Sequence, residues 1–458
     1  MPGLQSVVFP GSPTGWVFPG DPGIPSTLAP TRYNNFAPRI GIAYSPDSKT
    51  SFRAGYGVFF TSFEGASNFN EIGDAPFGFF YASPVPPSFA TPFMDRGTGT
   101  SELQRFPVVF PPLNVSAKNP DNTVNWALFT PIASSPGFNK NNRLPYAEDY
   151  ELSVQRQFSA STVATLSYVG TQGHRLLSDI ESNPGNPALC LATPGCGPNL
   201  ENQFHTRLPV FGPNFGSNGW FITIGQSSYN SLQLNLRHTS GRLSTLVAYT
   251  YSKAMDNSSG YGEQVNPFIP KASMGLSAFD VTHNFVVSYN YRLPIDKLGG
   301  PKRLTRGWAL SGITRFATGI PVYIYENDDR SLLGTQFTGP IVLGIDTPNQ
   351  VGPLHTSDPR KGPFFDPSAF APENLGQLGD ARRRFFHGPG INNWDIALLK
   401  DTQFTERMNL QFRVEFFNIF NHAQFGGVNG NISAGNGFGV ATSVAQPRIG
   451  QLSLKLNF

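Results

Sequence analysis

The chain has 458 residues, of which only 14% are charged and 13% are aromatic, with 48 Gly and 41 Pro. Charge this sparse is unusual for a soluble surface, since about a quarter of residues in soluble domains are charged. A formal net charge of +3 argues against a nucleic-acid partner. No stretch approaches the roughly 20 continuous apolar residues that a membrane-spanning helix needs.

Segments in which apolar and polar residues alternate recur along the chain. Each is about as long as a tilted membrane-spanning strand of about 9–11 residues. In the clearest one, Phe52 and Tyr56 share one face while Arg53 and Gly55 occupy the other. The pattern predicts eleven strands, at Phe36–Tyr44, Ser51–Phe60, Glu151–Phe158, Val163–Val169, Tyr229–Arg237, Thr245–Lys253, Asn284–Arg292, Arg306–Ala317, Asn393–Leu399, Asn409–Phe417 and Gly450–Phe458.

The connections between these strands alternate in length. The short ones are Ser45–Thr50, Ser159–Thr162, Thr239–Arg242, Pro294–Thr305 and Lys400–Met408. The long ones, rich in Gly, Pro and Asn, are Thr61–Asp149, Gly170–Ser228, Ala254–His283, Thr318–Asn392 and Asn418–Ile449. Half-buried strands of a soluble sandwich are also apolar on one face. Regular alternation of tight turns and long loops, however, is typical of outer-membrane barrels. The predicted fold class is therefore an all-β, antiparallel transmembrane β-barrel.

The direction of the strands predicts an incomplete barrel. The last strand ends at Phe458, and in bacterial barrels the C-terminus lies in the periplasm. Counting back, the first of eleven strands begins outside the cell, whereas bacterial barrels have an even number of strands. We therefore expect about half of a barrel at residues 36–458, with residues 1–35 as an external-loop remnant or linker. The N-terminus shows no basic stretch followed by an apolar one and does not predict a signal peptide.

Several motifs carry a resemblance to a known family. The most specific lie near the C-terminus, at Phe365–Ala371, Gly388–Gly390, Trp394–Lys400, Phe404–Arg407 and Gln411–His422, and earlier ones lie at Tyr33–Gly41, Arg53–Gly57 and Tyr249–Asp256. These motifs resemble TonB-dependent outer-membrane receptors of the Oar-like group. The resemblance implies a barrel of about 22 strands, an N-terminal plug and, through that plug, coupling to the TonB complex. The plug and the first half of the barrel are not part of this sequence.

Polar residues on the inward face of the strands are candidates for lining the lumen, or for contacting a plug or solute. They are Arg53, Gln233, Arg237, Arg292, Arg413, Glu415 and Lys455. By resemblance to other barrels, Phe458 is a candidate signal for the barrel-assembly machinery, the alternative being an aromatic at the membrane interface. A Pro-Gly turn separates Cys190 from Cys196, so they are either a loop disulfide or two unpaired thiols.

No motif predicts catalysis, and we expect neither an enzyme nor a cofactor. Histidines 174, 205, 238, 283, 355, 387 and 422 are scattered, and no nucleophile elbow or phosphate loop is present. Gly435–Gly439 is interpreted as a flexible loop stretch. Asp328 and Asp329 after Glu326 are either calcium ligands or, as favoured, a solvated acidic turn. Arg382–Arg384 either attract an anion or form a solvated charge cluster near the barrel rim.

Together these features favour a barrel segment of a TonB-dependent receptor that captures and imports a bulky, unidentified solute. Its expected place is the bacterial cell outer membrane, and its expected partners are membrane lipid, the assembly machinery, the plug, the first half of the barrel and the TonB complex. Two alternatives remain open. One is a passive porin-like channel, and the other is a secreted, soluble β-rich protein for carbohydrate binding or adhesion.

Overall fold

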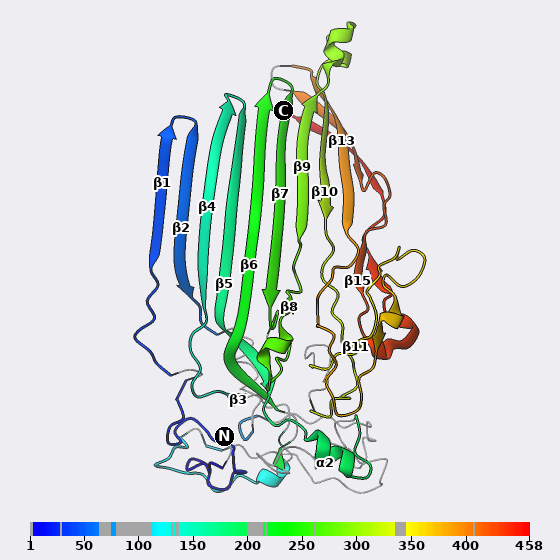
Figure 1. The fold of residues 1–458 in the computed structure, drawn as a ribbon. Coiled ribbons are helices and arrows are strands. Elements are labelled where there is room, and N and C mark those ends of the chain that lie inside the picture. The colour runs from blue at the N-terminus through cyan, green and yellow to red at the C-terminus, as the bar shows by residue number, and fades with distance from the viewer. Residues whose placement is uncertain are drawn as a thin grey trace.

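The computed structural model describes residues 3–27, 30–63, 75–78, 111–112, 114–129, 132, 137–198, 214–215, 218–260, 262–334, 345–405 and 408–458. One antiparallel sheet dominates this part of the chain (Figure 1). The sheet forms because each long strand is hydrogen-bonded to the long strand that precedes or follows it in the sequence. Its path is β1-β2-β4-β5-β6-β7-β9-β10-β13-β14-β17.

Eleven strands form this path, which confirms the predicted all-β, antiparallel fold. They are β1 (Arg39–Asp47), β2 (Thr50–Phe60), β4 (Tyr146–Ser159), β5 (Thr162–Glu181), β6 (Gly219–Ser240), β7 (Leu243–Asp256), β9 (His283–Arg292), β10 (Trp308–Ala317), β13 (Ile391–Gln403), β14 (Asn409–Phe417) and β17 (Ile449–Asn457). Two further strands of two residues each, β3 (Gly137–Phe138) and β8 (Gly275–Leu276), pair with β6 and β7 beside the path.

Two strands exceed their predicted lengths by the widest margin. β5 has 20 residues and β6 has 22, because they continue to pair with each other past Val169, for example at Gly170↔Asn230 and Gln172↔Ser228. These additional residues are mostly small or polar. Alternating hydrophobicity reveals only the part of a strand that has an apolar face, so it gave no sign of the extension.

Short turns and long loops lie at opposite ends of the sheet, as the alternation predicted (Figure 1). The C-terminus lies at the short-turn end, together with η4 (Pro294–Leu298) and α4 (Lys302–Thr305), whereas the N-terminus lies among the long loops. None of the described helices is long and apolar enough to cross a membrane. The loop end contains the remaining small elements, η1 (Trp126–Leu128), α2 (Pro187–Ala192), η3 (Pro270–Ser273), β11 (Asn349–Gln350), η5 (Pro367–Ala369), β12 (Phe370–Ala371), β15 (Phe425–Val428), η6 (Ile432–Gly437) and β16 (Ala441–Val444).

The register of the sheet collects the apolar side chains on one face. Residues directly opposite each other in an antiparallel pair point to the same side. The pairs Leu152↔Tyr168, Tyr168↔Leu232 and Leu232↔Tyr251 therefore extend one apolar row across four strands. The other members of this face follow from the same register and include Ile40, Ile42, Phe52, Tyr56, Leu166, Leu234, Val287, Ile396, Phe412, Val414, Leu452 and Leu454.

This apolar face is exposed rather than packed. Ile40 is 66% exposed, Leu152 55% and Leu452 72%. A soluble monomer rarely exposes one apolar patch larger than a few hundred square ångströms. An exposed apolar face that extends over eleven strands therefore fits the hydrocarbon of a membrane, while the mainly polar opposite face fits a lumen.

The sheet is open. β1 has β2 as its only neighbour along the path and β17 has only β14, so the first and last strands are not joined to each other. This confirms the prediction that these edges do not close a ring. The free edges present N–H and C=O groups that lipid cannot satisfy.

Most of the buried apolar side chains lie in the loops rather than in the sheet. One cluster consists of Val322, Ile324, Phe364, Phe365, Ala369, Phe370, Ala381 and Phe438. The other consists of Val8, Phe9, Phe18, Ala75, Trp126 and Phe129. The N-terminal segment thus packs against the connection between β2 and β4. The Gly435–Gly439 stretch lies in the β15–β16 connection, where it overlaps η6 and contains the buried Phe438.

The two faces of β6 should respond differently to a positive charge. We expect Leu234→Arg to cost about 2–4 kcal/mol because it places a charge in hydrocarbon near the bilayer midplane. Gln233→Arg, one residue earlier and on the polar face, is the matched control and should be mild. The measurement is reversible unfolding of the protein in lipid bilayers. Equal costs at the two positions would contradict the assignment of the faces.

Candidate functional site

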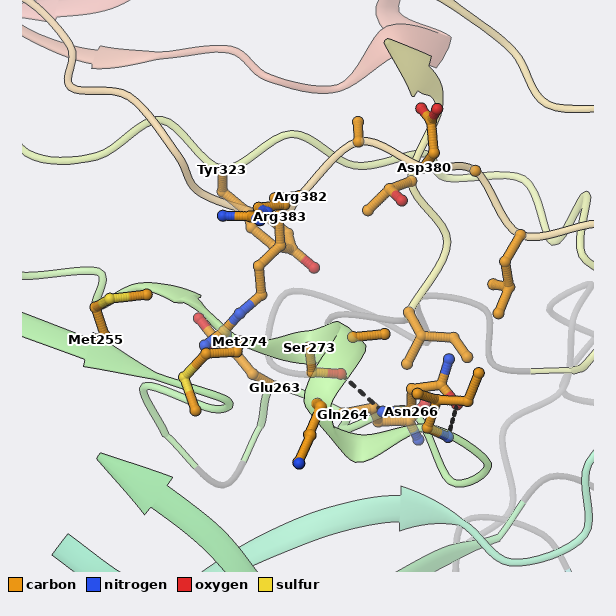
Figure 2. Close-up of a pocket in the computed structure, with 18 residues that line it drawn as sticks. Met255, Glu263, Gln264, Asn266, Ser273, Met274, Tyr323, Asp380, Arg382 and Arg383 are labelled. Atoms are coloured by element: carbon orange, nitrogen blue, oxygen red, sulfur yellow. Dashed lines mark hydrogen bonds and ion pairs between the residues drawn. The ribbon is translucent and has the colours of Figure 1, made fainter. Parts of the chain in front are cut away.

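Two long loops meet beside the loop end of β7 and enclose a pocket of about 550 Å³. The first is the β7–β9 connection, residues 257–282, and the second is the β10–β13 connection, residues 318–390. Figure 2 shows Met255, Glu263 and Met274 on one wall, with Tyr323 and Arg383 on the other. Segments far apart in sequence therefore build the pocket. No sequence motif predicted it.

Arg383 links the two walls through buried ion pairs. Its guanidinium contacts the carboxylates of Asp256 and Glu263, and it also donates a hydrogen bond of 2.8 Å to the Asp256 carbonyl. Arg384 contacts Glu263 as well and donates to the Ser259 hydroxyl at 3.3 Å. The side chains of the two arginines are only 8% and 5% exposed. We call Asp256, Glu263, Arg383 and Arg384 the ion-pair cluster.

This geometry corrects the interpretation of Arg382–Arg384 as a solvated cluster or an anion site. Two of the three arginines are buried and paired with acids, and only Arg382 is exposed. The partner acids lie about 120 positions earlier in the chain. Sequence inspection had no local signal for so distant a pairing.

Backbone contacts join the arginine segment both to the first wall and to its own loop. The Leu276 N–H donates to the Arg384 carbonyl at 3.0 Å, and the Ile324 N–H donates to the Arg383 carbonyl at 2.7 Å. A Cβ atom added at Gly275 would lie 2.9 Å from the Arg384 carbonyl oxygen. This close approach of two backbones therefore requires glycine at position 275.

The ion-pair cluster is electrically balanced. Burial of the Glu263 carboxyl opposes its ionisation, but the hydrogen bond from Arg384 and the charge of Arg383 outweigh burial and lower the pKa of Glu263. The Arg384 guanidinium also lies 4.8 Å from the centre of the Tyr323 ring. Burial, followed by the negative charge of Glu263, raises the pKa of Tyr323, so its phenol stays protonated at neutral pH.

Lys271 and Arg382 give the pocket a positive character. Both line it and both are exposed, and neither forms an ion pair with any residue that the structure describes. Asp380, a lining acid, accepts a hydrogen bond from the Gln350 N–H at 2.7 Å. Because Glu263 is engaged by arginines, the exposed charges of the lining are those of Lys271, Arg382 and Asp380.

The seven predicted lumen residues lie on the sheet, away from the pocket lining. The register runs Arg53↔Ser153, Ser153↔Ser167 and Ser167↔Gln233, which places Arg53 and Gln233 on the polar face. Alternation places Arg237, Arg292, Arg413, Glu415 and Lys455 on this face too. Within this set Arg413 and Glu415 form an ion pair of 2.5 Å. Their contact with a plug or a solute stays a prediction.

The remaining predicted residues occupy separate places. Cys190 and Cys196 form a disulfide, with Cα atoms 5.3 Å apart. Phe458 follows β17 and is 94% exposed. His205 lies outside the described residues. In the described part of the chain, no group of three or more His, Cys, Asp or Glu side chains is placed to hold a metal ion.

The predicted solvated acidic turn was wrong. Glu326 is 7% exposed and Asp329 is fully buried, so Asp328 is the exposed acid of the three. The β10–β13 loop packs around its own apolar cluster and encloses these acids. A sequence window cannot show burial that arises from residues some 40 positions away.

Loss of one arginine from the ion-pair cluster should loosen the pocket. We expect Arg384→Met to destabilise the contact between the two walls by up to about 3–5 kcal/mol, because breaking a buried pair leaves a charge without its partner. Arg382→Met, at the exposed neighbour, should change stability by less than about 0.5 kcal/mol. The measurement is hydrogen exchange of the Leu276 amide, which donates to the Arg384 carbonyl. Similar protection in both variants would contradict a stabilising role.

Comparison with known proteins gives both family and fold matches. The family model of the outer membrane beta barrel domain matches residues 2–451. No curated protein matches the chain. Among solved structures, the chain is similar to the outer membrane transporter YddB from Escherichia coli, with 10% identity and a TM-score of 0.43 over 90% of this chain and 39% of that one. It is also similar to the FrpB iron transporter (F3-3 variant) from Neisseria meningitidis, with 11% identity and a TM-score of 0.41 over 92% and 39% of the two chains.

A third similar structure is the ferric-catecholate import receptor Fiu from E. coli K12, with 10% identity and a TM-score of 0.39 over 92% of this chain and 34% of that one. The chain thus spans about two-fifths or less of the length of these transporters. The family match, in contrast, covers nearly the whole chain. The chain belongs to the outer membrane beta barrel domain family and is a protein of the bacterial outer membrane.

Proposed function

We propose that the chain is the C-terminal barrel portion of a TonB-dependent receptor of the Oar-like group, which captures and imports a bulky solute without catalysing a reaction. The observation that carries the proposal is the division of the sheet into an exposed apolar face and a polar face, with long loops enclosing a pocket at one end. The motifs at Trp394–Lys400 and Gln411–His422 support this receptor class in particular.

The open edges support a larger barrel. Unpaired backbone groups on β1 and β17 need partners inside a membrane. In the proposal, further strands pair with these edges and a plug fills the lumen, where it contacts polar side chains such as Arg53, Gln233 and Lys455. The plug in turn engages the TonB complex.

The proposed receptor also assigns a role to each of the two parts of the chain. Residues 36–458 form the barrel portion, and residues 1–35 form part of an external loop. The packing of Phe9 against Trp126, with ring centres 6.0 Å apart, supports the second assignment because it joins this segment to the β2–β4 loop.

The two alternatives predict other properties. A secreted, soluble protein would have to expose the whole apolar face to water. That face is larger than the apolar patches that soluble monomers usually expose. A passive porin-like channel shares the two-faced sheet but carries no plug. The permeability of the lumen therefore separates the proposed receptor from a porin.

Reconstituted full-length protein should be closed to small solutes. In proteoliposomes we expect glucose to enter no faster than through protein-free liposomes, because a plug occupies the lumen. Deletion of the plug should open the barrel and is the control for correct insertion. Glucose entry through the unmodified protein at the rate of the deletion variant would favour a porin.

Phe458 should matter for assembly. We expect deletion of Phe458 from the full-length protein to lower the amount of assembled receptor in the outer membrane while synthesis stays normal. Deletion of another exposed aromatic, Phe420 in the β14–β15 loop, is the control. Quantification of the folded protein in purified outer membranes measures the effect. Unchanged levels would leave Phe458 as an interface aromatic.

A further inference from the structure

The long β10–β13 loop encloses a group of acids, which we call the acid cluster. It consists of Glu326, Asp329, Asp346 and Glu373, which are 7%, 0%, 3% and 1% exposed. Their charges interact. The negative charge of Glu373 raises the pKa of both Glu326 and Asp346, and the negative charge of Asp329 raises the pKa of Asp346. Burial of so many like charges is costly unless each carboxylate has partners.

Asp329 has such partners. Its Oδ1 atom accepts hydrogen bonds from the Ser331 hydroxyl at 3.1 Å and the Leu333 N–H at 3.2 Å. Its Oδ2 atom accepts one from the Gly334 N–H at 2.8 Å. Both carboxylate oxygens of Asp329 therefore have hydrogen-bond donors.

The other three acids lack enough donors. Glu326 Oε2, Asp346 Oδ1 and both carboxylate oxygens of Glu373 are buried without a hydrogen-bond partner in the described part of the chain. Arg330 is the cation beside them, but it donates to the backbone carbonyl of Glu373 at 3.1 and 3.0 Å. Its Nε atom remains 3.9 Å from Glu326 Oε1. Residues 335–344, TQFTGPIVLG, contain no ionisable side chain that could add a charge.

Protonation resolves this deficit. Burial, followed by the neighbouring Glu373 carboxylate, raises the pKa of Glu326 to about 9. Burial and the charge of Asp329 raise the pKa of Asp346. A protonated Glu326 can donate to the Glu373 carboxylate and so satisfy an oxygen on each side.

The acid cluster lies directly behind a wall of the pocket. Asp346 is between Ile345 and Thr347, which both line the pocket. The Glu326 N–H donates to the Asp346 carbonyl at 3.2 Å, and Tyr323, three residues before Glu326, is visible on the same wall in Figure 2. Movement of Glu326 away from Asp346 would therefore displace the pocket wall.

We propose that Glu326, Asp346 and Glu373 form a proton-dependent contact that stabilises this wall when protons are bound and releases it as the pH rises. The effect on solute capture rests on the proposed receptor function. The contact itself is a property of the loop and can be measured without a solute.

The direction of the pH effect follows from proton linkage. A carboxyl whose pKa is higher in the closed loop than in the open loop binds protons more tightly when the loop is closed. The resulting stability is fully present below the ordinary value of 4.5 for Glu326 and is lost as the pH rises through about 9. The wall should therefore be loosest at alkaline pH.

Hydrogen exchange of the full-length protein in detergent tests the proposal. The reporters are the amides of Glu326 and Ser331, which donate to the Asp346 carbonyl and carboxylate. After correction for intrinsic exchange, we expect their protection to fall between pH 5 and pH 9, by at most about tenfold per pH unit for each proton released. The Leu276 amide, at the balanced ion-pair cluster, should keep its protection and serves as the internal reference.

Variants separate proton release from other causes. Glu373→Gln should weaken the pH dependence, because an amide donates to Glu326 without a proton from solvent. Asp328→Asn, at the exposed neighbour, should retain the pH dependence of the unmodified protein. If Glu373→Gln does not fold, Glu326→Gln makes the same test.

Three results would overturn the proposal. The first is equal protection of the reporter amides at pH 5 and pH 9 in the unmodified protein, and the second is unchanged pH dependence in Glu373→Gln. The third is restoration of protection at pH 9 by Ca²⁺ and its loss with a chelator, which would assign the acid cluster to a cation. None of these results bears on glucose entry into proteoliposomes, so failure here is distinguishable from failure of the proposed receptor function.

Discussion

A chain inside the hydrocarbon of a membrane must pair every backbone N–H and C=O group within the protein, because no water is present to replace a missing partner. In this chain each long strand meets the requirement by pairing with its neighbour in sequence, from β1 to β17. This neighbour-to-neighbour order also fixes the ends of the molecule, because it sends all short turns to one side and all long loops to the other (Figure 1). The open edges at β1 and β17 are the places where the requirement is not met by the sheet itself.

The same pairing sorts the side chains. Because opposed residues face the same side, a single register carries Leu232 and Leu234 to the apolar face and Gln233 to the polar one. Two cations on the apolar face lie close to the short turns, where they reach polar partners: Arg156 pairs with Asp47 at 3.3 Å, and Lys400 donates to the Arg306 carbonyl at 2.6 Å. Such side chains extend their apolar stems along the face and keep their charged ends away from its centre.

How well the sequence predicted the structure depends on how local the determining contact is. The alternation in Asn409–Phe417 gave both bounds of β14, because a period of two is visible within a few residues. The extension of β5 beyond Val169 was missed, because its polar residues pair with β6 without an apolar face. Arg383 and Glu326 were misinterpreted because the side chains that bury or pair with them are distant in sequence. The residues next to Arg383 and Glu326 in the sequence give no sign of these contacts.

The pocket walls combine two kinds of electrostatics in one loop. The ion-pair cluster has two arginines for two acids, and the lowered pKa of Glu263 keeps that acid ionised at neutral pH. The acid cluster has four acids and one arginine, and that arginine is engaged mainly by a backbone carbonyl. A balanced set of charges is insensitive to moderate changes of pH, whereas an excess of buried carboxyls is stable only while protons compensate for it. Paired charges thus hold the wall near Arg383 to β7 over a range of pH. In the proposed contact, the wall near Asp346 depends instead on bound protons, so the two walls should respond differently to pH.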